Sequence, residues 1–418
     1  MKKQKQDSDI IVGLDVGTTK ICVIVARMKD DKSVDIIGVG KGPSSGLHRG
    51  IVVNPTKAEA SIKYALENAE QNCGTPINSV TVGVAGHHIR CINTSSVVGI
   101  NNADRTIHQS DIDRLLEQAK LIRLPGDTTI VDVIPQEFTV DDKDKYDEPP
   151  IGVFGIKLEV KANIITGILS SIEDLSVCVQ NCGVDIDEIV LEPIASSHAV
   201  LDETEKKVGV AMLDIGGGTT DVAVFKRGVL KYTAGIGLAG NLVTEDIVEG
   251  LGILNDEAEK IKREYGYALV DEILNDDNIT VRSLRGQIPR TVKKSVLARI
   301  IQARMQDIFE LSAIEIANSQ IANELHAGVV ITGGGSLVRG AKELAEYILK
   351  QEVNLGTPQG ISGGLIKEVE SPIYATGVGL VLHRLKNINR KKVSTFRQPD
   401  KTNKQNILSN VKKWFDEL

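Results

Sequence analysis

Two stretches of the chain, about two hundred residues apart, share one pattern of apolar runs and glycine turns. Residues 11–25 carry apolar and β-branched residues on both sides of a Gly-Thr-Thr turn, and residues 210–225 repeat this arrangement. Apolar runs of this length on either side of a glycine turn predict buried strands joined by a tight hairpin. The chain is therefore predicted to contain two hairpins whose tips expose backbone amides.

Each copy of the pattern continues in the same way. A third strand is predicted at 34–40 in the first copy and at 229–235 in the second, and helices are predicted at 56–72 and 241–251. Repetition of a whole supersecondary unit is typical of duplicated folds. We therefore expect two related subdomains that face each other.

The segment between the copies, residues 86–165, has a different pattern. It contains a predicted helix at 109–121, which Ser110 or Asp111 would cap. Strands are predicted at 94–100, 129–140 and 156–169, and the acidic run 141–150 is predicted to be a solvated loop. This segment is interpreted as an inserted small α/β domain.

The second copy is followed by a helical insertion at 256–304 and by a third glycine cluster within 329–340. Beyond these, the pattern of apolar positions weakens and basic residues dominate: Lys386, Arg390, Lys391, Lys392, Arg397, Lys401 and Lys404 face a single acid, Asp400. A polar segment of one charge sign cannot build a core, so residues 386–404 are predicted to be a flexible basic linker.

The last residues form one more amphipathic segment. Its apolar positions fall on a single helical stripe: Ile407, Leu408, Val411, Trp414, Phe415 and Leu418. The segment is shorter than the roughly 18 residues that span a bilayer, but it suits a helix lying in the membrane interface. The alternative is a helix that packs on the body of the protein or on a partner.

Composition narrows the classes of function. A chain of 418 residues should form two lobes or more. Its net charge of −7 gives the body no general attraction for nucleic acid, so no nucleic-acid partner is expected. Five cysteines without a C-x-x-C pair suit a reducing compartment, and no signal peptide or spanning segment is visible. We expect a protein that stays in the cytoplasm.

The glycine turns carry the chemistry expected of a phosphate site. Glycines let a backbone approach phosphate closely, and successive amides and threonine hydroxyls donate to its oxygens. Asp15 and Asp214, at the bases of the two tips, are placed to hold Mg²⁺ through water. The third cluster, Gly333 to Gly335, would let a purine lie flat. A single such run would be only a turn, but three runs in this order favour a nucleotide site.

These residues resemble the superfamily of actin, heat-shock chaperones and sugar kinases. Its first phosphate motif is matched by Asp15, Gly17, Thr18, Thr19 and Lys20, its second by Asp214, Gly216, Gly217, Gly218, Thr219 and Thr220, and its adenosine motif by Gly333, Gly334, Gly335 and Ser336. Residues 192–195 and 374–379 resemble its two connecting helices. The resemblance implies an α/β, actin-like two-lobed fold that binds ATP and Mg²⁺.

Two further elements follow from this resemblance. Glu259 and Lys262 resemble the pair that the superfamily places against the ribose and base, although a simple intrahelical ion pair on a solvated face would show the same spacing. Gly240 and Asn241 resemble the loop that closes over the phosphates.

Within the superfamily, residues 80–86, the insertion after them and the C-terminal tail resemble the FtsA family of bacterial division proteins. The chain lacks room for the peptide-binding domain of a chaperone, and the MreB type has no such tail. The resemblance implies a peripheral protein at the division septum, on the cytoplasmic side of the membrane. Its implied partners are FtsZ, further copies of itself in filaments, an anionic membrane surface and other division proteins. A pilus-assembly ATPase is the alternative.

The resemblance also implies a division into parts. These are a first core lobe at 1–85, 166–195 and 370–385, an inserted SHS2-like subdomain at 86–165, a second core lobe at 196–242 and 305–369, a helical subdomain at 243–304, the linker 386–404 and the membrane-targeting helix 405–418.

Two functional classes remain open. One is an adaptor that ATP switches between states, and the other is a working ATPase whose turnover is central. The sequence identifies no catalytic base with certainty, and Glu192 and Asp214 are only candidates. The chain is therefore predicted to bind ATP, with weak hydrolysis left as an open question.

Overall fold

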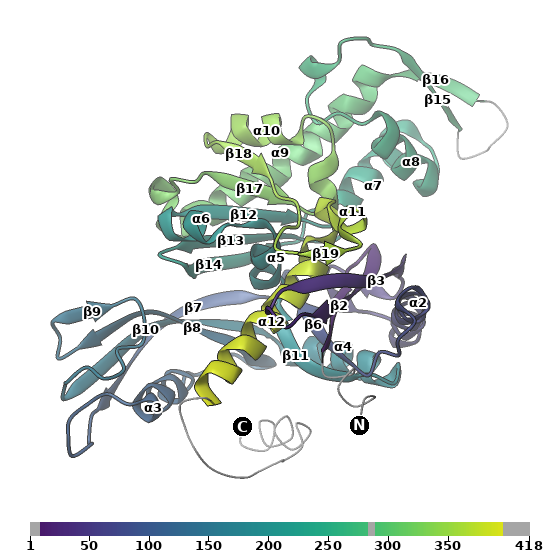
Figure 1. Cartoon of the computed structure of the whole chain (residues 1–418). Coiled ribbons are helices and arrows are strands. Elements are labelled where there is room, and N and C mark those ends of the chain that lie inside the picture. Colours follow the sequence, from purple (N-terminus) through teal and green to yellow (C-terminus); the bar gives the residue numbers. More distant parts are fainter. Residues whose placement is uncertain (1–8, 283–288, 396–418) are drawn as a thin grey trace.

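A computed structural model describes residues 9–282 and 289–395, with side chains as far as residue 389. Two lobes, each built on a central sheet, lie one above the other, and a separate small sheet extends to one side (Figure 1). The predicted membrane helix at 405–418, with its six apolar residues, lies outside the described residues.

The first lobe is built on a six-stranded sheet in the order β11-β6-β1-β2-β3-β19. Its strands are β1 Ile10–Val16, β2 Lys20–Met28, β3 Val34–Pro43, β6 Ser79–Val84, β11 Asp185–Leu191 and β19 Gly363–Gly364. β1, β2 and β3 form an antiparallel meander, while β6 and β11 add to it in parallel. The outer face is covered by α2 Pro55–Cys73 and α4 Leu169–Asn181.

The second lobe repeats this arrangement. Its sheet has the order β14-β13-β12-β17-β18, which matches β3-β2-β1-β6-β11 strand for strand. The strands are β12 Val210–Ile215, β13 Thr220–Lys226, β14 Val229–Ile236, β17 Val329–Thr332 and β18 Val353–Leu355. Its outer face is covered by α7 Gly240–Leu251, α9 Lys294–Asn318 and α10 Ala341–Leu349. The predicted duplication, including both third strands and both following helices, is confirmed.

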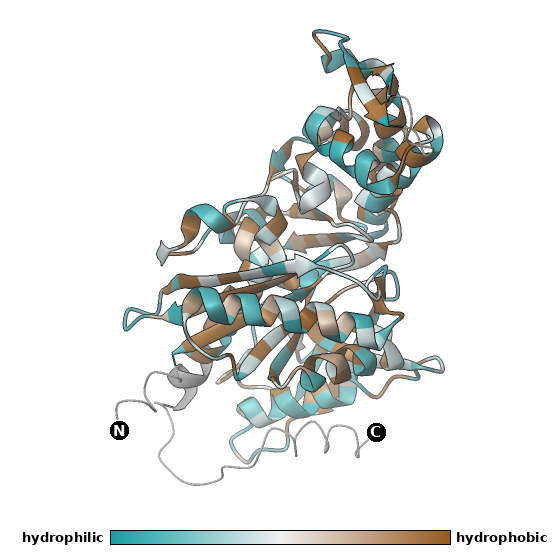
Figure 2. Ribbon diagram, turned by 90° about the vertical axis from the view of Figure 1, so that its right-hand side faces the viewer, coloured by the Kyte–Doolittle hydropathy of each residue, from teal (hydrophilic) through white to brown (hydrophobic). Residues whose placement is uncertain are grey.

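Two helices lie between the lobes. They are α5 Glu192–Val200 and α12 Ala375–Thr395, and they pack against each other in the centre of the molecule (Figure 1). Their apolar side chains share one core with the facing sides of both sheets. The strands appear apolar and the outer helices polar on their exposed sides in Figure 2, as this layering requires. Both predicted connecting helices therefore link the lobes.

The inserted domain forms its own four-stranded sheet, in the order β7-β10-β8-β9. The strands are β7 Arg90–Gly99, β8 Thr128–Val140, β9 Asp144–Tyr146 and β10 Lys157–Ile168, with α3 Gln109–Ala119 packed on them. The predicted caps, Ser110 and Asp111, lie inside the first turn of the helix, and the N-cap is His108. The Asp111 carboxylate accepts from the His108 backbone N–H at 3.0 Å.

The second insertion is less helical than predicted. It contains α8 Asn255–Tyr265 and the short η1 Val270–Glu272, but also a hairpin of β15 Asn278–Arg282 and β16 Pro289–Lys293. Three predicted boundaries, at 195/196, 242/243 and 304/305, fall inside the continuous helices α5, α7 and α9. These helices bridge neighbouring parts because each packs on both sides of the division.

The start of the predicted linker is helical. α12 continues to Thr395, so residues 386–395 extend the helix where a flexible segment was predicted. Ile388 packs on the central core, and the Asn387 amide donates to Glu188 at 2.9 Å, which explains why the helix persists despite its basic sequence. Within the described ranges, no helix is both long and apolar enough to cross a membrane.

The remaining elements are short. They are β4 Leu47–His48, β5 Ile51–Val52, α6 Glu203–Val208, η2 Ala322–Glu324, η3 Gly334–Leu337, α11 Ile366–Val369 and η4 Pro372–Tyr374. Of these, η3 and η4 matter most here, because they border the hairpin tips.

Candidate functional site

The tips of the two hairpins touch across the space between the lobes. A Cβ atom placed on Gly218 would lie 2.5 Å from Thr18 Oγ1, and one placed on Gly217 would overlap Thr19 Oγ1. Any side chain at these glycines would push the tips apart. The glycines of one tip and the threonines of the other are therefore complementary, and they bring two sets of backbone amides to one place.

The register of the strands shows which positions of the hairpins are equivalent. Asp15 pairs with Cys22 across β1 and β2, and Asp214 pairs with Asp221 across β12 and β13. Cys22 and Asp221 therefore hold equivalent places in the two hairpins. Aligning the hairpins on their two Gly-Thr-Thr sequences would instead match different residues. The sequence prediction of the site omitted Asp221. The feature of the sequence that could have indicated Asp221 is its place opposite Asp214 in the predicted hairpin.

Four carboxyl groups gather at the bases of the hairpins: Asp15, Glu192, Asp214 and Asp221. Burial is the main cause that raises the pKa of each, to about 6 for Asp15 and to about 8 for Asp221. Burial also raises the pKa of Glu192 well above its ordinary value. The negative charge of Asp214 raises the pKa of the other three. A cation is the natural partner for such a group.

Lys20 is the basic side chain at this place. It lowers the pKa of Asp15 and of Asp214, against the effect of burial. Its ammonium group donates to the Ile373 carbonyl and lies 4.9 Å from the centre of the Tyr374 ring. The equivalent position in the second hairpin is Thr219, so the cation belongs to the first hairpin alone.

The carboxylate of Asp214 is held on both sides. Its Oδ2 accepts from Ser196 Oγ at 2.8 Å and from Thr376 Oγ1 at 3.3 Å. Its Oδ1 lies against Gly333, where a Cβ atom would overlap it. Gly333 also has a φ of +80°, which favours glycine. The predicted metal-site residue is therefore fixed by the connecting helices and by the third glycine run.

The start of α7 is tied to the second tip. The Gly240 N–H donates to the Gly216 carbonyl at 3.0 Å, and the Asn241 N–H donates to the Gly217 carbonyl at 2.8 Å. Thr19 Oγ1 of the first tip donates to Asn241 Oδ1 at 3.1 Å. The predicted closing loop thus lies beside both tips.

Glu259 and Lys262 form contacts with each other and with α7. They form the intrahelical ion pair that the sequence left as an alternative, with 2.6 Å between Lys262 Nζ and Glu259 Oε2. They also reach α7: Thr244 Oγ1 donates to Glu259 at 2.7 Å, and Lys262 Nζ donates to the Gly240 carbonyl at 2.9 Å. The pair therefore lies next to the closing loop.

The third glycine run is not equally open along its length. A Cβ atom on Gly335 would overlap the buried side chain of Ile215, so this glycine packs on the core of the second lobe. Gly334 has only Ile373 Cγ2 nearby, at 3.7 Å from a Cβ atom. Ser336 is buried and donates to the Gly333 carbonyl at 2.7 Å, which closes the turn. Only Gly334 presents an open backbone face.

The geometry suits a phosphate-bearing ligand better than a metal bound by side chains alone. In the described parts of the chain, no three His, Cys, Asp or Glu side chains converge as direct ligands of an ion. The open backbone face at Gly334 would instead accept a flat base, and the backbone amides of the two neighbouring tips would accept a phosphate chain. Carboxylates at its floor suit Mg²⁺ that keeps most of its waters.

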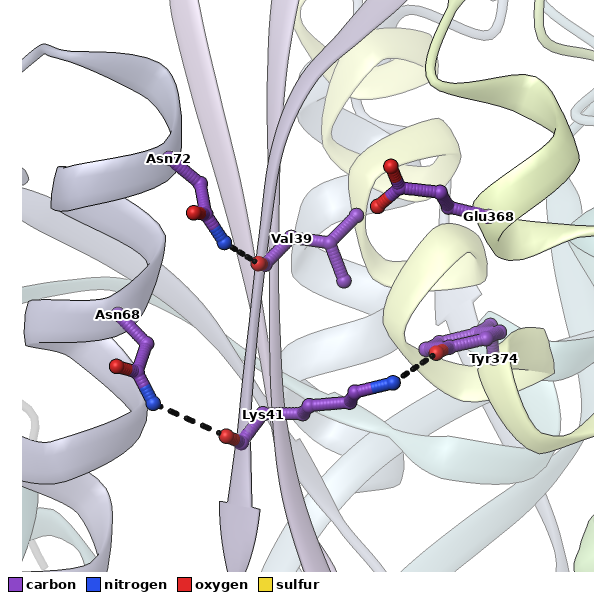
Figure 3. A pocket seen from close by; sticks show the side chains of 6 residues that line it. All are labelled: Val39, Lys41, Asn68, Asn72, Glu368 and Tyr374. Atoms are coloured by element: carbon purple, nitrogen blue, oxygen red, sulfur yellow. Dashed lines mark hydrogen bonds between the residues drawn. The ribbon is translucent and has the colours of Figure 1, made fainter.

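A separate pocket of about 430 Å³ lies beside β3, between α2 on one side and α11 and η4 on the other (Figure 3). Its lining residues are Val39, Lys41, Asn68, Asn72, Glu368 and Tyr374. Lys41 Nζ reaches the Tyr374 hydroxyl at 3.5 Å, so the ring under Lys20 also borders this pocket. It carries none of the predicted site residues.

Comparison with solved structures identifies the fold. The PilM–PilN type IV pilus biogenesis complex matches with a TM-score of 0.64 at 15% identity, covering 90% of this chain and 98% of that one. An MreB protein of Spiroplasma citri, whose structure is bound to ADP, matches with a TM-score of 0.56 at 14% identity, covering 92% and 99%. The fold is therefore the predicted actin-like one.

Comparison with protein families is more specific. The family model for "Cell division protein FtsA" matches residues 211–379, and that for "SHS2 domain inserted in FTSA" matches residues 86–166. The FtsA protein of Pseudomonas aeruginosa is 37% identical over 98% of both chains, and that of Neisseria meningitidis is 40% identical over 90% of both. The FtsA protein of Bacillus subtilis is 36% identical over 94% of this chain and 88% of its own. A pilus-assembly role is not favoured, and the chain belongs to the FtsA family of actin-like cell division proteins.

Proposed function

We propose that this division protein binds ATP with Mg²⁺ between its two hairpins and uses the bound nucleotide as a structural switch. The observation that carries this proposal is the contact of the two tips, because a phosphate chain there would touch both lobes. Binding energy gained from both lobes favours the closed arrangement over an open one. The nucleotide would thus control how the lobes lie.

The residues at the tips have separate roles. Backbone amides of Gly17 and Gly216 to Gly218, together with Thr18, Thr19, Thr219 and Thr220, would hold the phosphates. Mg²⁺, when bound, would offset the charge of the phosphates, with Asp15 and Asp214 holding its water. Lys20 adds positive charge from the first lobe. Glu259, Lys262, Gly334 and the loop at Gly240 and Asn241 would face the nucleoside.

The adaptor role rests on the sequence of the tail and on the family. We propose that Ile407, Leu408, Val411, Trp414, Phe415 and Leu418 enter the interface of an anionic membrane as one helix. The body would then hold FtsZ, copies of itself in filaments and other division proteins at the septum. The protein would act peripherally, on the cytoplasmic side of the membrane, with the inserted domain 86–165 serving assembly.

An adaptor is favoured over an enzyme with rapid turnover. Burial raises the pKa of Glu192 well above its ordinary value, which favours the protonated form, and a protonated carboxyl cannot accept a proton from water. Asp214 already accepts two hydroxyl hydrogen bonds on its Oδ2. Either group would act as a base only after the charges around it change. Steady-state phosphate release, measured with and without lipid, separates the classes: slow release unaffected by lipid supports the adaptor, and rapid lipid-stimulated release overturns it.

The nucleotide site is tested with Gly334→Asp. A Cβ atom fits at this position, so the fold should survive, while the added carboxylate repels the nucleotide. We expect ATP affinity to fall below detection by equilibrium dialysis. The matched control is Gly99→Asp at the end of strand β7, where a Cβ atom meets only Asn101 Oδ1 at 3.7 Å. Unchanged ATP affinity in Gly334→Asp would refute the assignment.

The membrane tether is tested with Leu408→Glu and Trp414→Glu together. Two charges on the apolar stripe should abolish pelleting with anionic vesicles, while ATP binding persists. Wild-type binding should weaken with salt but not vanish, because only its electrostatic part is screened. Co-pelleting of FtsZ with the vesicles should be lost in the same variant. Persistent pelleting of the double variant would show that the tail packs on the body or on a partner.

A further inference from the structure

Two hydroxyl groups from different helices converge on one oxygen of Asp214. Ser196 is on α5 and Thr376 is on α12, and both donate to Asp214 Oδ2, at 2.8 and 3.3 Å. The two hydroxyls are also 3.1 Å apart, within hydrogen-bond distance. Ser196 is fully buried and Thr376 is 8% exposed, so water does not compete freely for these bonds.

The helices that carry the hydroxyls are those that join the lobes. They cross in very close contact, because a Cβ atom on Gly379 of α12 would overlap the Ala195 carbonyl of α5. Ala195 precedes Ser196, and Gly379 lies one helical turn after Thr376. A change in the crossing of the helices would therefore separate the two hydroxyls from each other and from Asp214.

A neighbouring serine shows that this arrangement is not a general property of the helix. Ser197 is equally buried, but its hydroxyl donates to the Ile194 carbonyl of its own helix at 2.8 Å. Ser196 instead donates its hydrogen to a carboxylate on the sheet of the second lobe. In the first hairpin, no side chain of the described residues is hydrogen-bonded to the equivalent Asp15, so the support is specific to one hairpin.

We propose that Ser196 and Thr376 are positioning residues that aim the Asp214 carboxylate at the metal–nucleotide complex when the two interlobe helices are in their closed crossing. This inference rests on the proposed nucleotide function and names the parts that couple it to the hinge. Asp214 Oδ1 lies close to the backbone of Gly333, where an added Cβ atom would overlap it, and on the Oδ2 side the two hydroxyls hold the carboxylate. Opening the lobes would release the carboxylate, and a correctly held metal–nucleotide complex would favour closure.

The test compares ATP affinity with Mg²⁺ and with EDTA in the full chain. Ser196→Ala and Thr376→Val each remove one hydroxyl, and each should reduce the Mg²⁺-dependent gain in affinity about tenfold, as expected for a hydrogen bond to a charged group. Affinity in EDTA should change less than about twofold, because the phosphate amides are untouched. The double variant should lose less than the product of the single effects, since both bonds share one oxygen.

Two controls separate positioning from packing. Thr376→Ser keeps the hydroxyl and should restore the Mg²⁺-dependent gain, while Ser197→Ala removes a hydroxyl that does not reach Asp214 and should leave the gain unchanged. Circular dichroism and thermal unfolding establish whether each variant folds. If Ser196→Ala does not fold, the comparison of Thr376→Val with Thr376→Ser decides between positioning and packing.

Three results would overturn the proposal. In the first, folded Ser196→Ala and Thr376→Val keep the wild-type gain. In the second, affinity falls equally with and without Mg²⁺, which would assign the hydroxyls to packing only. In the third, the wild-type chain itself binds no ATP in either condition, and the proposed function then fails along with the inference.

Discussion

The two lobes have the same strand order and the same hairpin, but they carry different chemistry at equivalent positions. Where the first hairpin has Lys20, the second has Thr219, and where the first has Cys22, the second has Asp221. Burial raises the pKa of the Cys22 thiol to about 12, so it stays neutral, while Asp221 adds an acid. At the hairpins, the first lobe therefore supplies the positive charge, and the second lobe adds a further acid.

This difference shows what a duplicated fold retains and what it changes. The register of a hairpin determines which residues lie opposite each other, and that register is the same in both lobes. Charge is set by single side chains and has diverged without altering the strands. A ligand that touches both tips therefore meets two similar cradles with unlike charges, which gives it one preferred orientation.

The largest effect should follow from breaking the complementarity of the tips. Gly218→Val places a branched side chain against Thr18, so the lobes should no longer close on the phosphates. We expect ATP affinity to fall at least about a hundredfold, the upper range for overpacking a tight contact. Gly99→Val, at a strand end where a Cβ atom meets only Asn101 Oδ1 at 3.7 Å, is the control. Nearly normal affinity in Gly218→Val would mean that the tips do not share a ligand.

The next largest effect should come from removing the cation of the first hairpin. Lys20→Met keeps the length of the side chain but loses both the charge and the donor to the Ile373 carbonyl. We expect ATP affinity to fall about ten- to a hundredfold, as for hydrogen bonds to charged groups. Thr219→Met, at the equivalent place in the second hairpin, should lower ATP affinity less. Calorimetric titration measures both affinities. Equal losses would contradict the assignment of charge to the first lobe.

Asp221 should give the second lobe a pH dependence that Cys22 does not give the first. Its pKa is raised from 3.8 to about 8, so the folded protein binds its proton more tightly than the unfolded chain does. This stabilisation is complete below pH 3.8 and is lost as the pH rises to about 8. Asp221→Asn should therefore melt like the wild type near pH 4 and a few °C above it near pH 8, because each kcal/mol is worth roughly 2–4 °C in large domains.

The comparison at Cys22 makes this prediction specific. Cys22→Ala removes a thiol whose pKa of about 12 lies outside the range, so its effect on the melting temperature should be the same at both pH values. A constant difference between Asp221→Asn and the wild type across the range would show that Asp221 is ionised in the folded protein.

Most of the fold could be predicted because periodic runs of apolar residues specify its strands and helices. The hairpins, both third strands, both connecting helices and the inserted domain were all visible in this way. The residues that sequence alone placed less well are those decided by contacts far along the chain. Gly335 looks open in sequence but packs on Ile215, and Ser336 closes its own turn. Asp221 ends the second phosphate motif but was not predicted to be a site residue, and its pairing with Asp214 brings it to the site.

The C-terminal part of the chain also has a feature, the length of α12, that local sequence did not predict. Its basic composition predicted a linker from residue 386, because charge density is a local property of the sequence. The helix nevertheless persists to Thr395 through the packing of Ile388 and the bond from Asn387 to Glu188, whose partners are nearly two hundred residues away. Local pattern predicted the start of α12, and distant contacts determine its length.

The smallest effects concern the third strands of the two sheets, β3 and β14, which hold equivalent positions. A side-chain amide donates to each strand: Asn72 donates to the Val39 carbonyl at 2.7 Å (Figure 3), and Asn163 of the inserted domain donates to the Lys231 carbonyl at 2.6 Å. Asn72 is exposed, so water can replace it, whereas Asn163 is only 4% exposed. The amide–carbonyl hydrogen bond should therefore contribute more to stability in the second lobe than in the first.

Asn163→Leu should cost about 1–3 kcal/mol of stability, because it removes a hydrogen bond made by a buried side chain. Asn72→Leu should cost no more than about 0.5 kcal/mol, as for ordinary surface changes. Thermal unfolding compares the two variants, and hydrogen exchange at β14 should rise only in Asn163→Leu if the inserted domain is seated there. ATP affinity should change less than about twofold in both, since neither bond reaches the tips. Equal destabilisation by the two variants would show that the inserted domain adds nothing to the second lobe beyond what α2 gives the first.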